Sequence, residues 1–314
     1  MEAVLRHDCA SHGHDVSDRG RLQAVRAIVT GMVPSALNEI DQLCETVLPE
    51  FDAYGELIAA VDAPVAGLLL RGEGADFTRR VSALMARWEM TEEARRYHLH
   101  LADSFEHKRI FLKLEWHAVG QSVERQVAVY YRRRPSVHDA LRILTRFTGV
   151  SVPVEDVREI GSLLGKDTVH FVAFTARPNQ PVWHKFYFSQ YVTPATGIHA
   201  EARLQRVVQR FVSAGPSVAR WAMYHDRLVP RHAADTMFVS LAVTEDGYDG
   251  SLKIDYPGVS PVVAAGLLDG LEAENAHTSL HTLCDVAGRP VLSYLGVRMG
   301  RGEKLLLKGY ADLP

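Results

Sequence analysis

The sequence predicts a closed antiparallel β-barrel of about ten strands with helices around its outside, an α/β (α+β) fold. Three observations lead to this prediction. Pairs of alternating segments joined by short turns recur along the chain, and strands joined in this way are antiparallel. Amphipathic helices follow these pairs and can pack on the apolar face of each strand. An open sheet of this size would expose two edges, whereas closure removes them and encloses the polar strand faces in a lumen.

The composition is that of an ordinary globular protein, with 314 residues of which 47% are hydrophobic and 23% charged. A formal net charge of -3 gives no reason to expect nucleic acid or an anionic membrane as a partner. The three cysteines lack metal-type spacing, and no apolar run has the length of a signal peptide or a membrane span. We therefore expect a cytoplasmic protein without a disulfide framework or a zinc site, and the sequence leaves open whether it is a monomer or a homodimer.

The chain divides into three parts by pattern. We expect residues 1–20 to form a flexible tail and residues 21–314 to form one domain. Within that domain, residues 21–96 have apolar residues at helical spacing, such as Leu22, Val25 and Val29. Residues 97–314 repeat a unit of strand, turn, strand and helix, and these units supply the strands of the predicted barrel.

Alternation and turn residues define the expected elements. The expected strands are 98–101, 110–117, 125–131, 169–177, 182–192, 237–244, 251–256, 280–285, 291–298 and 304–310. The expected helices are 76–89, 137–148, 201–212 and 262–271.

The strand at 182–192 shows the clearest division into two faces. Lys185, Tyr187 and Tyr191 share one face, whereas Phe186 and Phe188 share the other. We expect the phenylalanines beneath a helix and the lysine and tyrosines in the lumen.

The same alternation places other polar residues in the lumen. The strands at 110–117 and 125–131 contribute Lys113, Glu115, His117 and Arg125, with Val127, Val129 and Tyr131 on the face of Arg125. Later strands contribute Lys253, Asp255, Tyr294, Arg298, Lys304, Lys308 and Tyr310. Cations outnumber carboxylates in this set, and a buried cation requires a partner, so we expect a polyanion to bind there.

Two short motifs resemble those of the dimethylallyltryptophan synthase-type aromatic prenyltransferases, the ABBA enzymes, whose fold is a ten-stranded antiparallel barrel ringed by helices. Lys185-Phe186-Tyr187-Phe188, followed by Thr-Pro-Ala-Thr-Gly at 193–197, is similar to the family's lysine-x-tyrosine strand. The segment at 252–256 resembles the next lysine-containing strand, although Ser251 and Asp255 stand where the family has arginine and tyrosine. Glu115 and Arg125 resemble the family's catalytic glutamate and its first diphosphate-binding arginine. The likeness covers about residues 97–314.

The resemblance implies transfer of a dimethylallyl or geranyl group from its diphosphate to an indole-like, phenolic or peptide aromatic acceptor, with the prenyl diphosphate as co-substrate and no required cofactor or Mg²⁺. Glu115 would bind the N–H or O–H of the acceptor, and Glu115 or His117 would remove the ring proton. The donor site implied by the resemblance and the lumen comprises Arg125, Lys185, Tyr187, Tyr191, Lys253, Tyr294, Arg298, Lys308 and Tyr310, with the tyrosines shielding an allylic cation. The alternatives are a non-catalytic ligand-binding barrel and a repeat protein whose polar strand faces are solvated.

Overall fold

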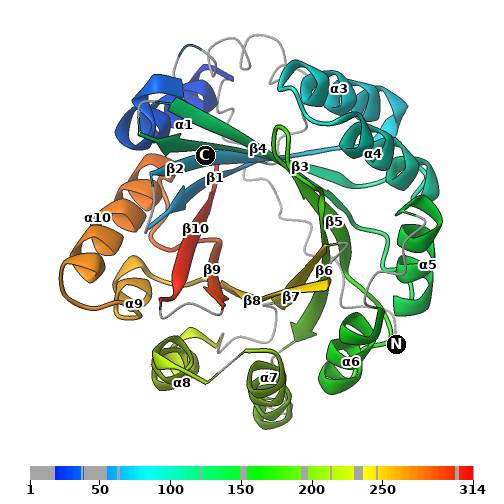
Figure 1. Ribbon diagram of the computed structural model, residues 1–314. Coiled ribbons are helices and arrows are strands. Elements are labelled where there is room, and N and C mark those ends of the chain that lie inside the picture. Colours follow the sequence, from blue (N-terminus) through cyan, green and yellow to red (C-terminus); the bar gives the residue numbers. More distant parts are fainter. Residues whose placement is uncertain are drawn as a thin grey trace, which may run out of the picture.

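Ten strands form a closed antiparallel barrel (Figure 1). The computed structural model describes residues 18–36, 38, 55–61, 64–120, 122–148, 154–191, 197–212, 214–229, 236–244, 247–300 and 304–313. The strands are β1 (Gly55–Ala60), β2 (Val65–Gly72), β3 (Ile110–Val119), β4 (Ser122–Tyr131), β5 (Phe171–Ala176), β6 (Trp183–Tyr191), β7 (Thr236–Thr244), β8 (Gly247–Pro257), β9 (Tyr294–Met299) and β10 (Leu306–Asp312). Each strand pairs with its neighbours in sequence, and β1 closes the ring against β10.

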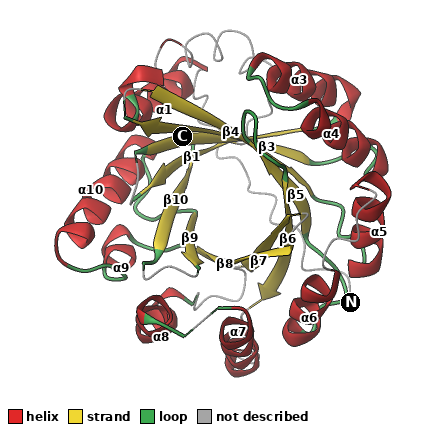
Figure 2. Cartoon of the chain, viewed as in Figure 1, coloured by secondary structure: helices red, strands yellow, loops and turns green. Residues whose placement is uncertain are grey.

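Helices surround the barrel on its outside (Figure 2). They are α1 (Asp18–Met32), α3 (Gly74–Arg87), α4 (Glu92–Ser104), α5 (Val137–Thr148), α6 (Val154–Leu164), α7 (Gly197–Phe211), α8 (Pro216–Leu228), α9 (Pro261–Ala265) and α10 (Gly270–Ala287), with a short 3-10 turn, η1 (Pro34–Ala36). Within the described ranges, no helix combines the length and the apolar character needed to span a bilayer.

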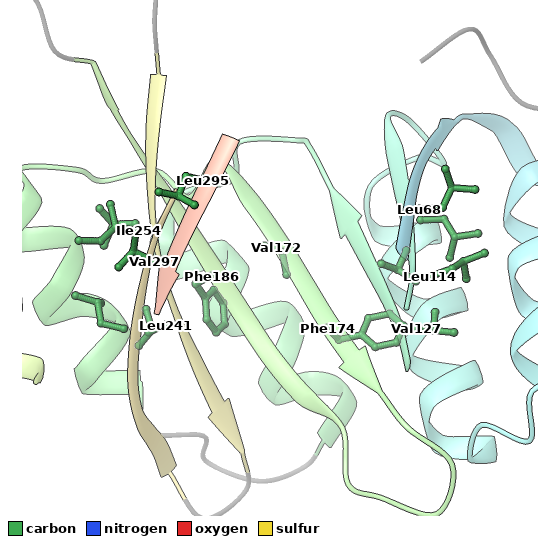
Figure 3. Close-up of a cluster of buried hydrophobic side chains, with 14 of the residues drawn as sticks. Leu68, Leu114, Val127, Val172, Phe174, Phe186, Leu241, Ile254, Leu295 and Val297 are labelled. Atoms are coloured by element: carbon green, nitrogen blue, oxygen red, sulfur yellow. The ribbon is translucent and has the colours of Figure 1, made fainter. Parts of the chain in front are cut away.

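The apolar core lies between the barrel and the helices. Figure 3 shows Leu68, Leu114, Val127 and Phe186 on the helix-facing side of their strands, and all four are fully buried. Burial of such side chains contributes about 1.5–3 kcal/mol each. The alternate residues of the same strands therefore point into the lumen, which fixes the chemistry of its wall.

The predicted fold class is confirmed, but two of the ten predicted strands are wrong. Residues 98–101 lie in α4, where buried His98 contacts the Tyr131 hydroxyl through Nδ1 at 2.6 Å, and residues 280–285 lie in α10. The two strands that replace them, β1 and β2, belong to the part predicted to be helical. The total was right because the two errors cancel.

The remaining predicted strands are confirmed with small shifts in their ends, and so are the helices at 76–89, 137–148 and 201–212. The helix predicted at 262–271 is instead the short α9 followed by the start of α10. The helical pattern at 22–29 corresponds to α1. The predicted tail, residues 1–20, lies outside the described residues except for the first turn of α1.

Candidate active site

Strand β6 places its side chains as the alternation predicts. Phe186 and Phe188 belong to the apolar core outside the barrel, whereas Lys185 and Tyr187 face inward. The Lys185 pKa is lowered well below 10.5 by burial and by the charges of Lys113 and Arg298. Tyr191 is the last residue of β6, but its side chain lies outside the described part, as does most of the motif at 193–197.

Glu115 on β3 is the centre of a buried polar cluster. Lys308 Nζ on β10 donates to Glu115 Oε1 at 2.6 Å, and Lys113 Nζ lies 3.2 Å from the same oxygen. Gln126 Nε2 on β4 donates to Oε2. We call Lys113, Glu115, Gln126 and Lys308 the Glu115 cluster. Its members come from β3, β4 and β10, so barrel closure is what brings them together.

Within the Glu115 cluster, Glu115 stays ionised near neutral pH, whereas Lys113 is only partly protonated there. Burial raises the pKa of Glu115, but attraction to Lys113 and Lys308 outweighs it and holds the pKa well below 4.5. Burial lowers the Lys113 pKa to about 7 despite attraction to Glu115. His117 Nε2 lies 3.9 Å from Glu115 Oε2, and burial lowers the His117 pKa to about 4. His117 is therefore neutral near pH 7.

Lys253 on β8 forms a second pair of opposite charges. Its Nζ lies 2.5 Å from Asp255 Oδ1 and donates to the Tyr310 hydroxyl at 3.0 Å. Burial opposes the charge, but Asp255 and the two nearby phenols raise the Lys253 pKa well above 10.5. Gly296 on β9 makes room for the pair, because a Cβ there would lie 2.5 Å from Lys253 Cε. Lys253 thus stays protonated inside the barrel.

Within the described part of the chain, Lys185 has no carboxylate partner of the kind that Lys113, Lys253 and Lys308 have. Among the described residues, no carboxylate lies within ion-pair distance of it and no hydrogen bond reaches it. Arg298 on β9 lies at the edge of the same region, where it donates to Ser251 Oγ and to Asp249 Oδ2. A buried cation without a counter-ion is costly, so this part of the lumen is suited to an anionic ligand.

A group of aromatic rings lies beside the cations. Phe171 on β5 contacts the rings of Phe111, Tyr130, Tyr187 and Phe238, with centroids 5.5–6.2 Å apart. Phe238 in turn contacts Tyr294, with centroids 5.7 Å apart. We call these six residues the aromatic group. Tyr310 is near the group's edge and covers Lys253, whose Nζ is 4.9 Å from the ring centroid. Ring faces in such numbers can stabilise a cation and exclude water.

The lumen retains open space. The side chains of Lys253 and Lys308 are 20% and 22% exposed although a closed wall of strands surrounds them. Small residues contribute to this space, because Lys185 pairs across the sheet with Ala173 and Ala242, and Lys113 pairs with Ala128.

The prediction that Arg125 faces the lumen is wrong. Arg125 pairs across the sheet with Trp116, which packs against Trp88, the residue that follows α3, on the helix side of the barrel. Val127, Val129 and Tyr131 share that outer face, whereas Gln126 points inward to Glu115. The prediction that Lys304 faces the lumen is also wrong, because Lys304 precedes β10 and pairs with Glu272 of α10 outside the barrel. The remaining described candidates, Tyr187, Tyr294, Lys308 and Tyr310 among them, face the lumen.

Sequence reasoning missed several luminal residues. Arg177 follows β5 and donates from Nε to Gln126 Oε1 at 2.8 Å, which links it to the Glu115 cluster. Tyr130, Phe171 and Phe238 were missed because apolar residues on an inner face do not stand out from core residues in the sequence. Alternation within β5 would have shown that Phe171 and Arg177 share a face. Within the described ranges, no group of His, Cys, Asp or Glu residues is arranged to hold a metal ion.

No family model and no curated protein sequence matches the chain. Solved structures do match. The 5-dimethylallyltryptophan synthase from Streptomyces coelicolor has a TM-score of 0.60 and 14% identity, covering 94% of this chain and 96% of that one. PriB in its binary complex with product diphosphate has a TM-score of 0.56 and 15% identity, covering 93% and 95%.

A third similar structure comes from another organism. AnaPT from Neosartorya fischeri has a TM-score of 0.56 and 10% identity, covering 92% of this chain and 91% of that one. The fold is the ABBA prenyltransferase barrel. The predicted resemblance is thus confirmed in architecture, and it extends to the N-terminal strands that the motifs did not cover. At these identities the likeness establishes the fold, and function has to be argued from the lumen.

Proposed function

We propose that this protein is an aromatic prenyltransferase, which moves a dimethylallyl or geranyl group from its diphosphate to an indole-like or other aromatic acceptor. One observation carries the proposal. Lys185 is enclosed in the barrel without a counter-ion among the described residues, and it lies near Lys253 and beside the aromatic group. A diphosphate supplies the missing anion, and an allylic chain attached to it meets ring faces.

In this mechanism, Lys185, Lys253 and Arg298 bind the diphosphate and neutralise the charge that develops as it leaves. The allylic C–O bond breaks with its electron pair going to the diphosphate. Tyr187, Tyr294 and Tyr310 screen the resulting cation, with roughly 0.5–2 kcal/mol from each ring depending on desolvation. The acceptor ring supplies the electron pair of the new C–C bond and then loses a proton.

The similar structures support the choice of substrates by analogy. PriB was also solved with L-tryptophan and dimethylallyl thiolodiphosphate, and NotF with brevianamide F and DMSPP. Among the described residues, four lysines, Arg177 and Arg298 place basic groups in this lumen, so we propose that turnover needs no divalent metal. The proposed product diphosphate leaves through the same open lumen.

The test is a turnover assay with dimethylallyl and geranyl diphosphates against indoles, phenols and aromatic peptides, in excess EDTA. We expect diphosphate release together with an acceptor whose mass has increased by one prenyl unit. Release only after Mg²⁺ is added would contradict metal independence alone. Absence of release across all donors and acceptors, with and without Mg²⁺, would favour a non-catalytic ligand-binding barrel.

A further inference from the structure

The carboxylate of Glu115 has little capacity left for a substrate. Each carboxylate oxygen offers about two lone-pair sites. Lys308 and Lys113 lie at Oε1, at 2.6 and 3.2 Å, and Gln126 donates to Oε2. The remaining direction at Oε2 is approached by His117 Nε2 at 3.9 Å, and the Glu115 side chain is fully buried. An acceptor N–H would have to displace one of these partners.

The two lysines beside Glu115, unlike the carboxylate, have hydrogen-bond donors to spare for a substrate. Each ammonium has three N–H donors, and Glu115 is the one carboxylate that the described residues place within ion-pair distance of either lysine. Two lysines thus share one negative charge. Lys113 has Ala128 as one cross-strand neighbour, Lys308 has Ala60, and the Lys308 side chain remains 22% exposed, so a ligand atom can approach this part of the lumen.

These lysines come from other strands than the cations assigned to the diphosphate, but the two sets lie close together. In the ring of strands, β3 and β10 flank the pair β1 and β2, whereas β6 and β8 flank β7, and β9 alone separates β8 from β10 (Figure 1). Lys113 and Lys308 belong to the first two flanking strands, and Lys185 and Lys253 to the other two. The charge of Lys113 acts on Lys185, and Lys253 donates to Tyr310 on β10, so a donor diphosphate and an acceptor oxygen bound to these two sets of lysines would be neighbours, as transfer between them requires.

We propose that the acceptor in the prenyl transfer argued above is a hydroxylated aromatic, whose oxygen binds to Lys113 and Lys308 as a phenolate, in place of an indole whose N–H binds to Glu115. This inference rests on the proposed function for its donor but on the Glu115 cluster for its substrate class. With a phenolate bound, two ammonium groups face one carboxylate and one phenolate, and the charges balance.

The step conserves atoms and charge. The phenol proton passes to the Lys113 amine, which is partly unprotonated near neutral pH because burial lowers its pKa to about 7. The allylic C–O bond breaks with its electron pair going to the diphosphate. A ring carbon ortho or para to the phenolate oxygen supplies the pair for the new C–C bond, and that carbon then loses its proton to water. The oxygen regains its proton from Lys113, so phenol and prenyl diphosphate give prenylated phenol, diphosphate and one proton.

The first experiment compares 2-naphthol, 2-methoxynaphthalene and indole as acceptors with dimethylallyl diphosphate. We expect kcat/KM to be at least about ten-fold higher for 2-naphthol than for indole, which corresponds to one charge-assisted hydrogen bond. The methyl ether, which cannot form an anion, should be a poor acceptor. Indole used as well as or better than 2-naphthol would overturn the inference and leave the proposed function intact.

The second experiment measures binding without turnover. Bound 2-naphthol should absorb as its anion at pH 8 in the wild-type protein. Lys113→Met and Lys308→Met should each weaken its binding by about ten-fold or more, while the affinity for dimethylallyl thiolodiphosphate stays within about two-fold. Lys108→Met is the matched control, because Lys108 is exposed and pairs with Glu106 at the surface.

The outcomes separate the two proposals. Lysine-dependent binding of the naphtholate without prenyl transfer would support the phenolate site and contradict the proposed function. Naphthol binding unaffected by either substitution, or equal loss of naphthol and donor binding, would overturn the phenolate site. Removing one lysine leaves Glu115 with fewer partners and can destabilise the fold. The double variant Glu115→Gln/Lys308→Met avoids that charge imbalance, and it should also fail to bind the naphtholate.

Discussion

Glu115 and Lys185 are buried in the same lumen but in opposite electrostatic conditions. Glu115 has three donors around it, and its pKa is held well below 4.5 by Lys113 and Lys308. Lys185 has neither a carboxylate nor a hydrogen bond among the described residues, and its pKa falls well below 10.5. The first charge is stabilised by the chain itself, whereas the second is stabilised only when an anion binds.

The difference indicates which residues position other groups and which bind substrate. A polar side chain whose partners are all within the protein fixes geometry, as Glu115 does for two lysines. A buried charge without a partner marks the place where a ligand completes the structure. By this criterion Lys185 belongs to the substrate site, and Glu115 acts by holding the lysines that contact the acceptor.

The largest expected effect is that of Lys185→Ala. Loss of the one luminal cation without a partner among the described residues should reduce kcat/KM by about 10²–10³-fold, as for removal of a group that stabilises a leaving anion. The protein should stay folded, because no described hydrogen bond or ion pair depends on this side chain. Steady-state kinetics and thermal melting test this. Full activity in the variant would remove Lys185 from the diphosphate site, and Lys108→Ala serves as the surface control.

Glu115→Gln should have a smaller effect of a different kind. Turnover should drop about 10–10²-fold because Lys113 and Lys308 lose the carboxylate that positions them, while the Kd for dimethylallyl thiolodiphosphate stays nearly constant. The two variants can be compared by calorimetric titration with the donor analogue. Equal weakening of donor binding in both would mean that Glu115 and Lys185 belong to one site, and the contrast between them would fail.

Lys113 should leave a signature in the pH dependence of stability. Its pKa is about 7 in the folded protein against an ordinary value of 10.5, so above pH 7 the unfolded chain binds more protons and stability rises with pH. The charges that act on Lys113 are those of Glu115, Lys308 and Lys253. Relative to Lys113→Met, the wild type should gain about 2 kcal/mol in unfolding free energy between pH 7 and pH 9. Urea unfolding at both pH values measures this, and parallel profiles would contradict it.

The barrel could be predicted from its hairpins, but two strands could not be placed. β1 is buried along its whole length, so its residues show no alternation of apolar and polar side chains. Its Leu and Ala residues also favour helices. The segment at 98–101 alternates histidine and leucine by coincidence. In α4 it is His98 and Leu101, one helical turn apart, that are buried.

The candidate site was predictable where polar and apolar residues alternate strictly. This holds for β6, where Lys185 and Tyr187 face the lumen and Phe186 faces the helices. The contact between Lys308 and Glu115 could not be predicted, because it joins residues 193 positions apart through closure of the ring.

The smallest expected effect is that of replacing Arg125, which we predicted to face the lumen but which lies on the outer face of β4. Because Glu124, Arg125 and Gln126 are all polar, the sequence does not show which of them points into the lumen. In the structure Val127 lies on the helix side, and Arg125 shares that side. Arg125→Ala should therefore change the donor Kd by less than about two-fold, as for a substitution outside the site. Gln126→Ala is the adjacent comparison. It removes a donor to Glu115 and should lower acceptor kcat/KM while sparing donor affinity. A ten-fold loss of donor binding in Arg125→Ala alone would mean that Arg125 contacts the diphosphate, and that β4 turns its other face to the lumen when substrate binds.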